Sequence, residues 1–333
     1  MHRDAAAGVR LLMAFAPLNV VCLGECMIEL RAYAPGLLAQ GFAGDTYNTA
    51  VYLKRLDAER RLRVHYATAL GSDSFADDML EAWQQEDIEA DLVRRIDGRT
   101  TGLYSIRTDA RGERRFSYWR EHSAARAYFD ATPAPLEAGA DSVDVLYLSG
   151  ISLAVMASAL PVRLPALLGR IRAHGGRVVF DNNYRPRLWA DAASARAAFA
   201  GLYAQADIAL VTLDDEAALH PELDAAAVLA HALALPCAEV VVKRGSASTL
   251  VRLAGRPPIE VPVEVVANPV DTTAAGDSFA AGYLTLRLAG GSPEAAAALG
   301  NRIAGVVIRH PGAIVARTAT AGLADGPGSQ ALR

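Results

Sequence analysis

The 333-residue sequence contains few of the cysteines that stabilise secreted proteins through disulfides or form zinc sites. It has three cysteines, Cys22, Cys26 and Cys237, an odd number that is too small for a disulfide framework. Cys22 and Cys26 are separated by three residues and have no second Cys or His pair, which argues against a zinc site formed by these thiols. We therefore expect reduced, buried thiols in a cytoplasmic protein.

The sequence also has no excess of basic residues and no uninterrupted apolar segment that reads as a transmembrane helix. The net charge is −4, so we expect neither a nucleic acid nor a membrane as a partner. The apolar run at 11–23 lacks a signal-peptide cleavage site and continues into GECMIEL. The run at 150–168 is interrupted by Pro161, Arg163 and Pro165, which argues against a transmembrane helix.

Two common nucleotide-binding motifs are missing. The chain has no G-x-x-x-x-G-K-[ST] phosphate-binding loop, and no G-x-G-x-x-G follows the first strand-like segment. The second absence argues against a Rossmann dehydrogenase. Hydrophobic residues make up 52% of the chain and charged residues 21%, a composition that supports a large core and excludes global disorder.

Short apolar runs alternate with alanine-rich segments of helical length along most of the chain. Such runs are typical of strands buried on both faces of a sheet. The alternation predicts an α/β fold with a mostly parallel central sheet and helices on both faces. Ligands of such sheets bind beyond the carboxyl ends of the strands. The predicted strands are 19–24, 143–150, 177–181, 207–212 and 239–243, and the predicted helices include 192–206 and 224–235.

Two segments, at about 25–43 and 98–120, instead alternate polar and apolar residues. The second contains a turn with Gly112, which predicts a hairpin. Together they predict a small β-sheet, set apart from the main one, that acts as a lid over the strand ends. The expected organisation is an N-terminal extension at 1–17, one folded domain at 18–317 that includes the lid, and a flexible tail at 318–333.

The strongest functional signal is NPVDTTAAGDSFAAGYLTLRLAGG at 268–291. Its small residues allow the backbone to approach a ligand, and the segment SFAAGYLTLRLA has helical spacing. The N–H groups at the start of such a helix form a site for phosphate oxygens. Asp277 lies at the mouth of this site, where it could accept the proton of an attacking hydroxyl. The alternative is an ordinary Asp or Ser helix cap.

DTTAAGDSFAAG (271–282) resembles the C-terminal signature of the ribokinase-type (PfkB) sugar kinases. GDTYNTAVYLKRL (44–56) and ALGSDSFADDML (69–80) resemble their N-terminal signature. The resemblance covers about 19–316, and motifs such as FDNNYRPRLW and VVVKRG follow the order found in members that phosphorylate 2-keto-3-deoxygluconate. It implies a ribokinase-like three-layer fold, ATP and Mg²⁺ as cofactors, and phosphoryl transfer to a small sugar acid.

The resemblance also implies roles for individual residues. Asp277 takes the proton of the sugar hydroxyl, and the backbone around Ala274, Ala275 and Gly276 forms the anion hole. The family more often has Gly at 274; Ala keeps the N–H but restricts φ, so we expect activity to persist. Gly44, Asp45 and Asn48 look like the loop that binds sugar hydroxyls. The nucleotide is expected to contact Asn183, Thr212, Lys243, Gly245, Ala274, Gly276 and Asn301.

Several side chains suit a substrate that carries a carboxylate. Tyr104, Tyr118 and Arg120 fall in the predicted lid, and Arg185 follows a predicted strand. Arginine can hold a carboxylate through two hydrogen bonds, whereas a neutral sugar would not require two arginines. The alternative for the two tyrosines is packing on a sheet face.

Two polar segments follow predicted strands. Asp181, Asn183 and Arg185 are spaced two residues apart and share one face if the strand continues; the alternative is a structural pair between Asp181 and Arg185. Glu216 matches the Glu of the N-x-x-E pattern with which the family organises Mg²⁺, but Leu213 replaces its Asn. The alternative for Glu216 is a solvated acid at a helix start.

Other functions remain open at this point. One is a kinase for another sugar or for a nucleoside, such as fructose, ribose or adenosine. Another is a sugar-sensing protein without catalysis, although the intact anion-hole segment and Asp277 argue against it. The lid would expose an edge and an apolar face that a second lid could cover, so we expect a homodimer or larger assembly. The expected small-molecule partners are a sugar acid and ATP.

Overall fold

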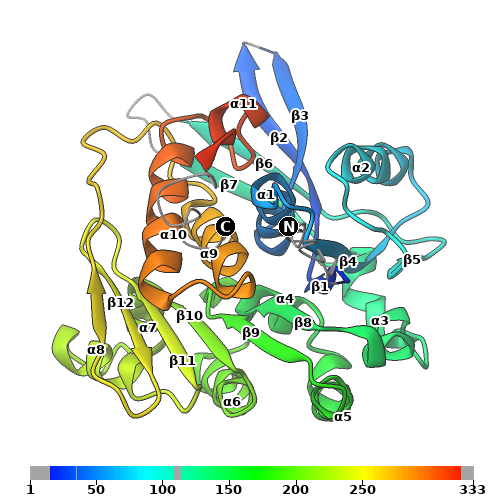
Figure 1. Ribbon diagram of the computed structural model, residues 1–333. Helices are drawn as coiled ribbons and strands as arrows, with labels where there is room; N and C mark the ends of the chain where they lie inside the picture. Colours follow the sequence, from blue (N-terminus) through cyan, green and yellow to red (C-terminus); the bar gives the residue numbers. More distant parts are fainter. Residues whose placement is uncertain (1–15, 35, 109–113, 324–333) are drawn as a thin grey trace, which may run out of the picture.

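The computed structural model describes residues 16–34, 36–108 and 114–323. In this part the chain forms a nine-stranded sheet and a separate four-stranded sheet (Figure 1). The large sheet contains, in spatial order, β13 (Ile259–Val261), β12 (Thr249–Leu253), β11 (Glu239–Lys243), β10 (Ile208–Thr212), β9 (Arg177–Asp181), β8 (Val145–Ser149), β1 (Leu18–Leu23), β4 (Leu62–Leu70) and β5 (Val93–Arg95).

The strands from β11 to β5 run parallel, and β12 and β13 join them antiparallel at one edge. Successive residues of β1 enter different cores, because Val21 and Leu23 pack on one face and Val20 and Cys22 on the other. This burial on both faces explains the continuous apolar runs in the sequence. The five predicted strands are confirmed to within two residues at each end.

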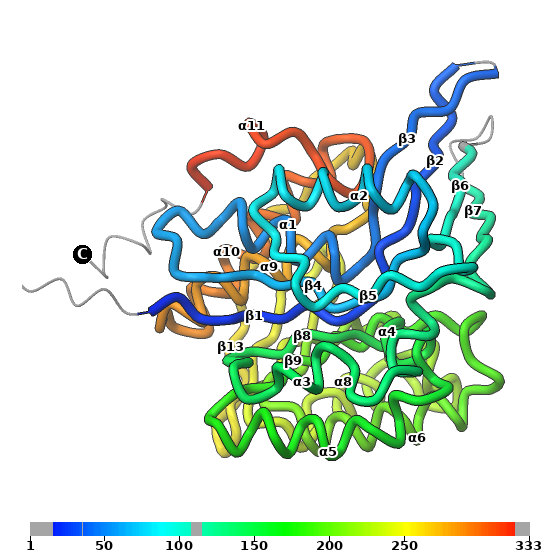
Figure 2. The backbone as a smooth tube through the Cα atoms, turned by 90° about the vertical axis from the view of Figure 1, so that its right-hand side faces the viewer, coloured from blue at the N-terminus to red at the C-terminus, as the bar shows by residue number. Residues whose placement is uncertain are grey.

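Helices cover both faces of the large sheet, as Figure 2 shows. Their apolar residues belong to two separate cores, one on each face. One face carries α1 (Asp45–Leu56), α2 (Ser74–Gln85), α9 (Ala275–Leu288) and α10 (Pro293–Val307), and the other carries α3 (Pro135–Ala138), α4 (Gly150–Val155), α5 (Leu160–Ala173), α6 (Ala192–Tyr203), α7 (Leu213–Leu219) and α8 (Ala225–Leu233). Short 3-10 helices lie at Ala124–Asp130, Ala140–Ser142 and Pro186–Leu188.

The small sheet is formed by the two segments with alternating polarity. Its order is β3 (Leu37–Ala43), β2 (Met27–Ala34), β6 (Leu103–Thr108) and β7 (Arg114–Trp119), and β2 pairs with β6 in parallel. In Figure 2 the sheet stands at one end of the molecule, and the hairpin of β2 and β3 projects from it. The predicted small sheet is therefore confirmed, whereas the predicted Gly112 turn lies outside the described residues.

Both ends of the expected domain at 18–317 fall within the described residues. Strand β1 begins at Leu18, one residue before the predicted strand at 19–24, and most of the predicted N-terminal extension lies outside the described residues. Helix α11 (Arg317–Thr320) covers the first residues of the predicted tail, and its Thr320 is buried. Among the described residues, no helix is long and apolar enough to cross a membrane.

Candidate active site

Polar residues meet at the carboxyl edge of the large sheet. Ser149, Asp181, Thr212 and Lys243 are the last residues of the neighbouring parallel strands β8, β9, β10 and β11. Lys243 Nζ donates to Asp181 Oδ1 at 3.2 Å and to Oδ2 at 2.9 Å. A methyl group placed on Gly276 would lie 3.5 Å from Lys243 Nζ. The segment that was predicted to bind an anion therefore lies at the strand ends, where ligands of such sheets bind.

Helix α9 begins without a capping side chain. By contrast, α2, α6, α8 and α10 each have an Asp or Ser cap that accepts a backbone N–H. Ala274 precedes the helix in the left-handed conformation, with φ 59°, and Ala275 N donates to Thr272 O at 3.3 Å. Gly276 and Asp277 follow as the second and third helical residues, whose N–H groups have no partner within a helix. Together with the helix dipole, these groups suit an anion.

The carboxylate of Asp277 faces helix α1. Asn48 Nδ2 donates to Asp277 Oδ2 at 2.8 Å, and Gly44 N donates to Asn48 Oδ1 at 3.4 Å. Thr49 Oγ1 also donates to the backbone oxygen of Asp277 at 3.3 Å. Burial and the nearby Asp45 carboxylate raise the pKa of Asp277 to about 8, while the hydrogen bond from Asn48 opposes this shift. The two predicted signature segments thus meet at the candidate base.

The carboxylate of Asp45 accepts hydrogen bonds from two side chains at the same edge. Ser149 Oγ donates to Asp45 Oδ2 at 2.5 Å, and Asn183 Nδ2 donates to the same oxygen at 2.8 Å. Burial raises the pKa of Asp45, and these hydrogen bonds oppose the shift. Gly44 allows this packing, because a Cβ at that position would lie 2.2 Å from the backbone oxygen of Glu25.

The strand does not continue beyond Asp181, and its continuation was the condition for a shared face of the residues at 181, 183 and 185. Strand β9 ends at Asp181, and Asn183 adopts a φ of 27°, so the residues at 181, 183 and 185 do not share a strand face. The alternative pair of Asp181 with Arg185 is wrong. Asp181 pairs with Lys243, whereas Arg185 Nη1 donates to Asp215 Oδ1 at 3.1 Å.

The lid residues lie close together, but two of them already have charged partners. Tyr104 OH donates to Glu29 Oε2 at 2.5 Å, and the rings of Tyr104 and Tyr118 lie 5.8 Å apart. Arg120 is buried and forms an ion pair with Glu25. Tyr118 remains 48% exposed. A substrate carboxylate would therefore share Arg120 with Glu25, whereas it could reach Tyr118 directly.

Several groups of the residues predicted to contact the nucleotide already have hydrogen-bond partners within the protein. Gly245 occupies the turn between β11 and β12 with φ 61°. The backbone N–H of Thr212 donates to Asn182 Oδ1 at 2.9 Å, and its carbonyl accepts from Asn182 Nδ2 at 3.1 Å. Asn301 accepts from Thr249 Oγ1 at 2.8 Å and donates to a backbone carbonyl at 3.1 Å. Its amide therefore already links α10 to the strands at the sheet edge.

Some residues of the site were not predicted to act there. Asp181 and Ser149 could have been found, because each is the polar last residue of a buried strand. Tyr147 could not, because it lies inside an apolar strand. Its hydroxyl lies 3.2 Å from Thr49 Oγ1 and 3.5 Å from Asp181 Oδ2, and burial raises its pKa.

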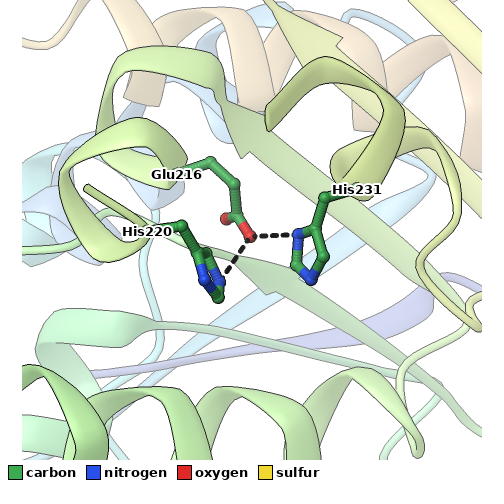
Figure 3. A group of neighbouring side chains, drawn as sticks. All are labelled: Glu216, His220 and His231. Atoms are coloured by element: carbon green, nitrogen blue, oxygen red, sulfur yellow. Dashed lines mark ion pairs between the residues drawn. The ribbon is translucent and has the colours of Figure 1, made fainter. Parts of the chain in front are cut away.

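Glu216 does not have the surroundings expected for a Mg²⁺ ligand. Its side chain is fully buried and lies between His220 and His231 (Figure 3). Asn182 and Tyr203 are its hydrogen-bond partners. Mg²⁺ prefers oxygen ligands and usually retains several waters. Glu216 offers one carboxylate flanked by two imidazoles instead of a set of oxygen ligands, so we do not assign Mg²⁺ to Glu216.

Comparison with known proteins identifies the family. A profile of the pfkB family carbohydrate kinases matches residues 17–320. The chain belongs to this family. The kinase is 47% identical over 300 residues to the 2-dehydro-3-deoxygluconokinase of Dickeya dadantii, covering 89% of this chain and 96% of the relative. It is 45% identical over 307 residues to the enzyme of that name from Escherichia coli K12, covering 90% and 98%.

The predicted ribokinase-like fold is confirmed by solved structures. A putative ribokinase II from E. coli in complex with ATP and Mg²⁺ aligns with the kinase at a TM-score of 0.76 and 20% identity. The alignment covers 90% of this chain and 94% of that one. At this level of identity the likeness concerns the fold alone.

Proposed function

We propose that the kinase transfers the γ-phosphoryl group of ATP to 2-dehydro-3-deoxy-D-gluconate, giving 2-dehydro-3-deoxy-6-phospho-D-gluconate and ADP. The observation that carries the reaction type is the uncapped start of α9, where Asp277 adjoins free helical N–H groups and Lys243. The choice of sugar is supported by relatives with 47% and 45% identity over nearly their full length.

In this proposal Asp277 accepts the proton of the primary hydroxyl as the hydroxyl oxygen attacks phosphorus. The new O–P bond forms while the bond from phosphorus to the β-phosphate oxygen breaks, and ADP leaves with that electron pair. The N–H groups of Gly276 and Asp277 and the ammonium of Lys243 stabilise the charge that develops on the transferred group. Mg²⁺ enters with ATP as part of the substrate and neutralises phosphate charge.

We assign the sugar hydroxyls to Asp45 and Asn48, which lie beside Asp277. Closure of the small sheet would exclude water, which otherwise competes as the phosphoryl acceptor. Tyr118 and Arg120 on that sheet, with Arg185 at the strand edge, are the groups we propose for the carboxylate. Asn183, Thr212, Lys243 and Gly245 are proposed for the nucleotide. The buried free cysteines and the need for ATP support a cytoplasmic location.

A substrate panel tests the proposal. ADP release is measured with 2-dehydro-3-deoxy-D-gluconate, fructose, ribose and adenosine under the same conditions. We expect the highest kcat/KM for the keto-deoxy acid. A preference for fructose would overturn the substrate assignment while leaving the kinase assignment intact. Tight binding of the sugar acid without any ADP release would instead favour the non-catalytic sensor.

We further propose that two copies of the kinase associate through the outer faces of their small sheets. A shallow depression on this face is lined by apolar residues together with Ser105 and Arg107. Leu38 on β3 is 52% exposed, and Trp119 on β7 is 61% exposed. A second lid would cover these side chains and the sheet edges.

A further inference from the structure

A group of metal-ligating side chains lies on α7 and α8, apart from the residues proposed for phosphoryl transfer. Glu216 lies on α7, His220 is the residue that directly follows this helix, and His231 comes from the last turn of α8. Figure 3 shows the three side chains pointing toward one another. Glu216 Oε1 lies 3.2 Å from His231 Nδ1 and 3.7 Å from His220 Nε2.

One oxygen of Glu216 lacks a hydrogen bond although its side chain is fully buried. Oε2 accepts from Asn182 Nδ2 at 3.2 Å and from Tyr203 OH at 3.3 Å. Oε1 accepts no hydrogen bond, and the buried Nδ1 atom of His231 has no hydrogen-bond partner either. A buried carboxylate oxygen without such a partner is costly. The geometry therefore calls for a positive charge between these atoms.

The second nitrogen of His220 has a carboxylate partner of its own. His220 Nδ1 lies 3.3 Å from Glu222 Oε1. A carboxylate only accepts hydrogen bonds, so Nδ1 carries a proton, and Nε2 on the other side of the ring faces Glu216. Histidines that bind metals show the same arrangement, in which the free ring N–H donates to a carboxylate.

We propose that Glu216, His220 and His231 bind a divalent transition metal ion of the zinc type, with water completing the coordination. Ligands of tetrahedral Zn²⁺ at 2.0–2.2 Å lie about 3.3–3.6 Å apart, close to the 3.2 and 3.7 Å observed here. Two imidazoles favour such an ion over Mg²⁺. The His231 side chain is 40% exposed, which gives the ion and its water access from solvent.

The ion has a structural role in this proposal. It joins α8 to α7 and holds Glu216 against Asn182. Asn182 in turn accepts the backbone N–H groups of Asn183 at 2.8 Å and Thr212 at 2.9 Å, at the ends of β9 and β10. The bound ion would therefore stabilise the loops next to the phosphoryl-transfer site without contacting a substrate.

Titration of the chelator-treated kinase with Zn²⁺ alone tests the site, in the absence of ATP because ATP itself binds zinc. We expect one Zn²⁺ per chain by calorimetry and a higher Tm, with no such response to Mg²⁺ alone. Co²⁺ should give the visible absorption of a low-coordinate nitrogen and oxygen site. His231→Gln and Glu222→Gln should each weaken zinc binding at least about tenfold while leaving the MgATP-dependent activity unchanged.

His174→Gln is the matched control. His174 is another half-exposed histidine next to a carboxylate, with its Nδ1 3.6 Å from Asp141, and its loss should not alter zinc binding. Failure of the wild-type kinase to bind Zn²⁺ saturably would overturn the proposal. Equal zinc affinity in the wild type and in His231→Gln would do so as well. A Tm that responds to pH but not to Zn²⁺ would assign the positive charge to a proton instead.

Discussion

Asp277 is placed where a carboxylate can exchange a proton near neutral pH. Burial and the Asp45 carboxylate both disfavour its charged form, whereas Asn48 and Lys243 favour it. A base is most effective when its pKa lies near the working pH. The same residues that would bind the sugar hydroxyls thus also set the proton affinity of the group that activates one of them.

Replacing this carboxylate tests its role. Asp277→Asn keeps an oxygen for the hydrogen bond from Asn48 but removes the proton acceptor. We expect kcat to fall at least about a hundredfold, the scale of general-base catalysis, with little change in the KM for the sugar. Steady-state kinetics measures both, and Asp214→Asn, at an exposed acid of α7, is the control. Turnover near the wild-type value in Asp277→Asn would show that the carboxylate is not the base.

The pH dependence of kcat/KM should report the pKa of Asp277 in the free enzyme. Only the deprotonated carboxylate accepts a proton, so activity should rise with pH, reach half of its maximum near pH 8 and level off above it. Asp45→Asn removes a negative charge that raises this pKa, so the rising limb should move to lower pH. Flat profiles below pH 8, or an unchanged limb in Asp45→Asn, would contradict this coupling.

The sequence predicted the residues of this network that belong to local motifs. Asp277, Asp45 and Asn48 were predicted from two signatures that lie more than two hundred residues apart, and the fold brings Asn48 within hydrogen-bonding distance of Asp277. The cluster of Glu216 with two histidines was not predicted, because one histidine lies on a different helix. Such a contact depends on how α7 and α8 pack, which local patterns do not specify.

At the scale of the elements, the position at which α9 begins determines which residues form the proposed anion site. The helix begins at Ala275, three residues earlier than its apolar spacing predicted, so Asp277 lies within the first turn and is not a cap. The local turn requires a left-handed residue at 274, and alanine fills it with φ 59°. That conformation is unfavourable for any residue with a Cβ.

Ala274→Gly should therefore stabilise the kinase by about 0.5–1 kcal/mol and leave kcat within about twofold, since the backbone N–H is retained. Ala275→Gly is the matched control, because residue 275 is helical and glycine there should destabilise by about 0.5–1 kcal/mol. Chemical denaturation and steady-state assays measure the two effects. Destabilisation by Ala274→Gly would show that the left-handed turn is not the conformation in solution.

The buried strands were the easiest elements to predict, since continuous apolar runs are typical of strands covered on both faces. Their exact ends were harder to predict. The segment after β9 keeps a polar alternation in sequence, yet Asn183 turns out of the strand so that its amide reaches Asp45. This turn is set by a long-range hydrogen bond, so the local pattern could not show it.

At the scale of the whole molecule, the two faces of the small sheet differ in polarity. Residues that pair across β2, β6 and β7 place Glu29, Tyr104 and Tyr118 on one face, and Leu30 with Ser105 on the other. The first face carries the polar groups that we propose for the substrate. The second carries apolar side chains that the described part of the chain leaves exposed, and this asymmetry leads to the prediction of a dimer.

Light scattering after size-exclusion chromatography tests this prediction. We expect the wild-type kinase to have about twice the mass of the 35.2 kDa chain. The double variant Leu38→Glu with Trp119→Glu should be a monomer, because two copies would then bring four carboxylates together on the apolar face. Val162→Glu, at an 85% exposed position on α5, should remain a dimer. A monomeric wild type would overturn the predicted dimer. A double variant that remains a dimer would show that the chains associate through another surface. Neither result would affect the outcome of the substrate panel.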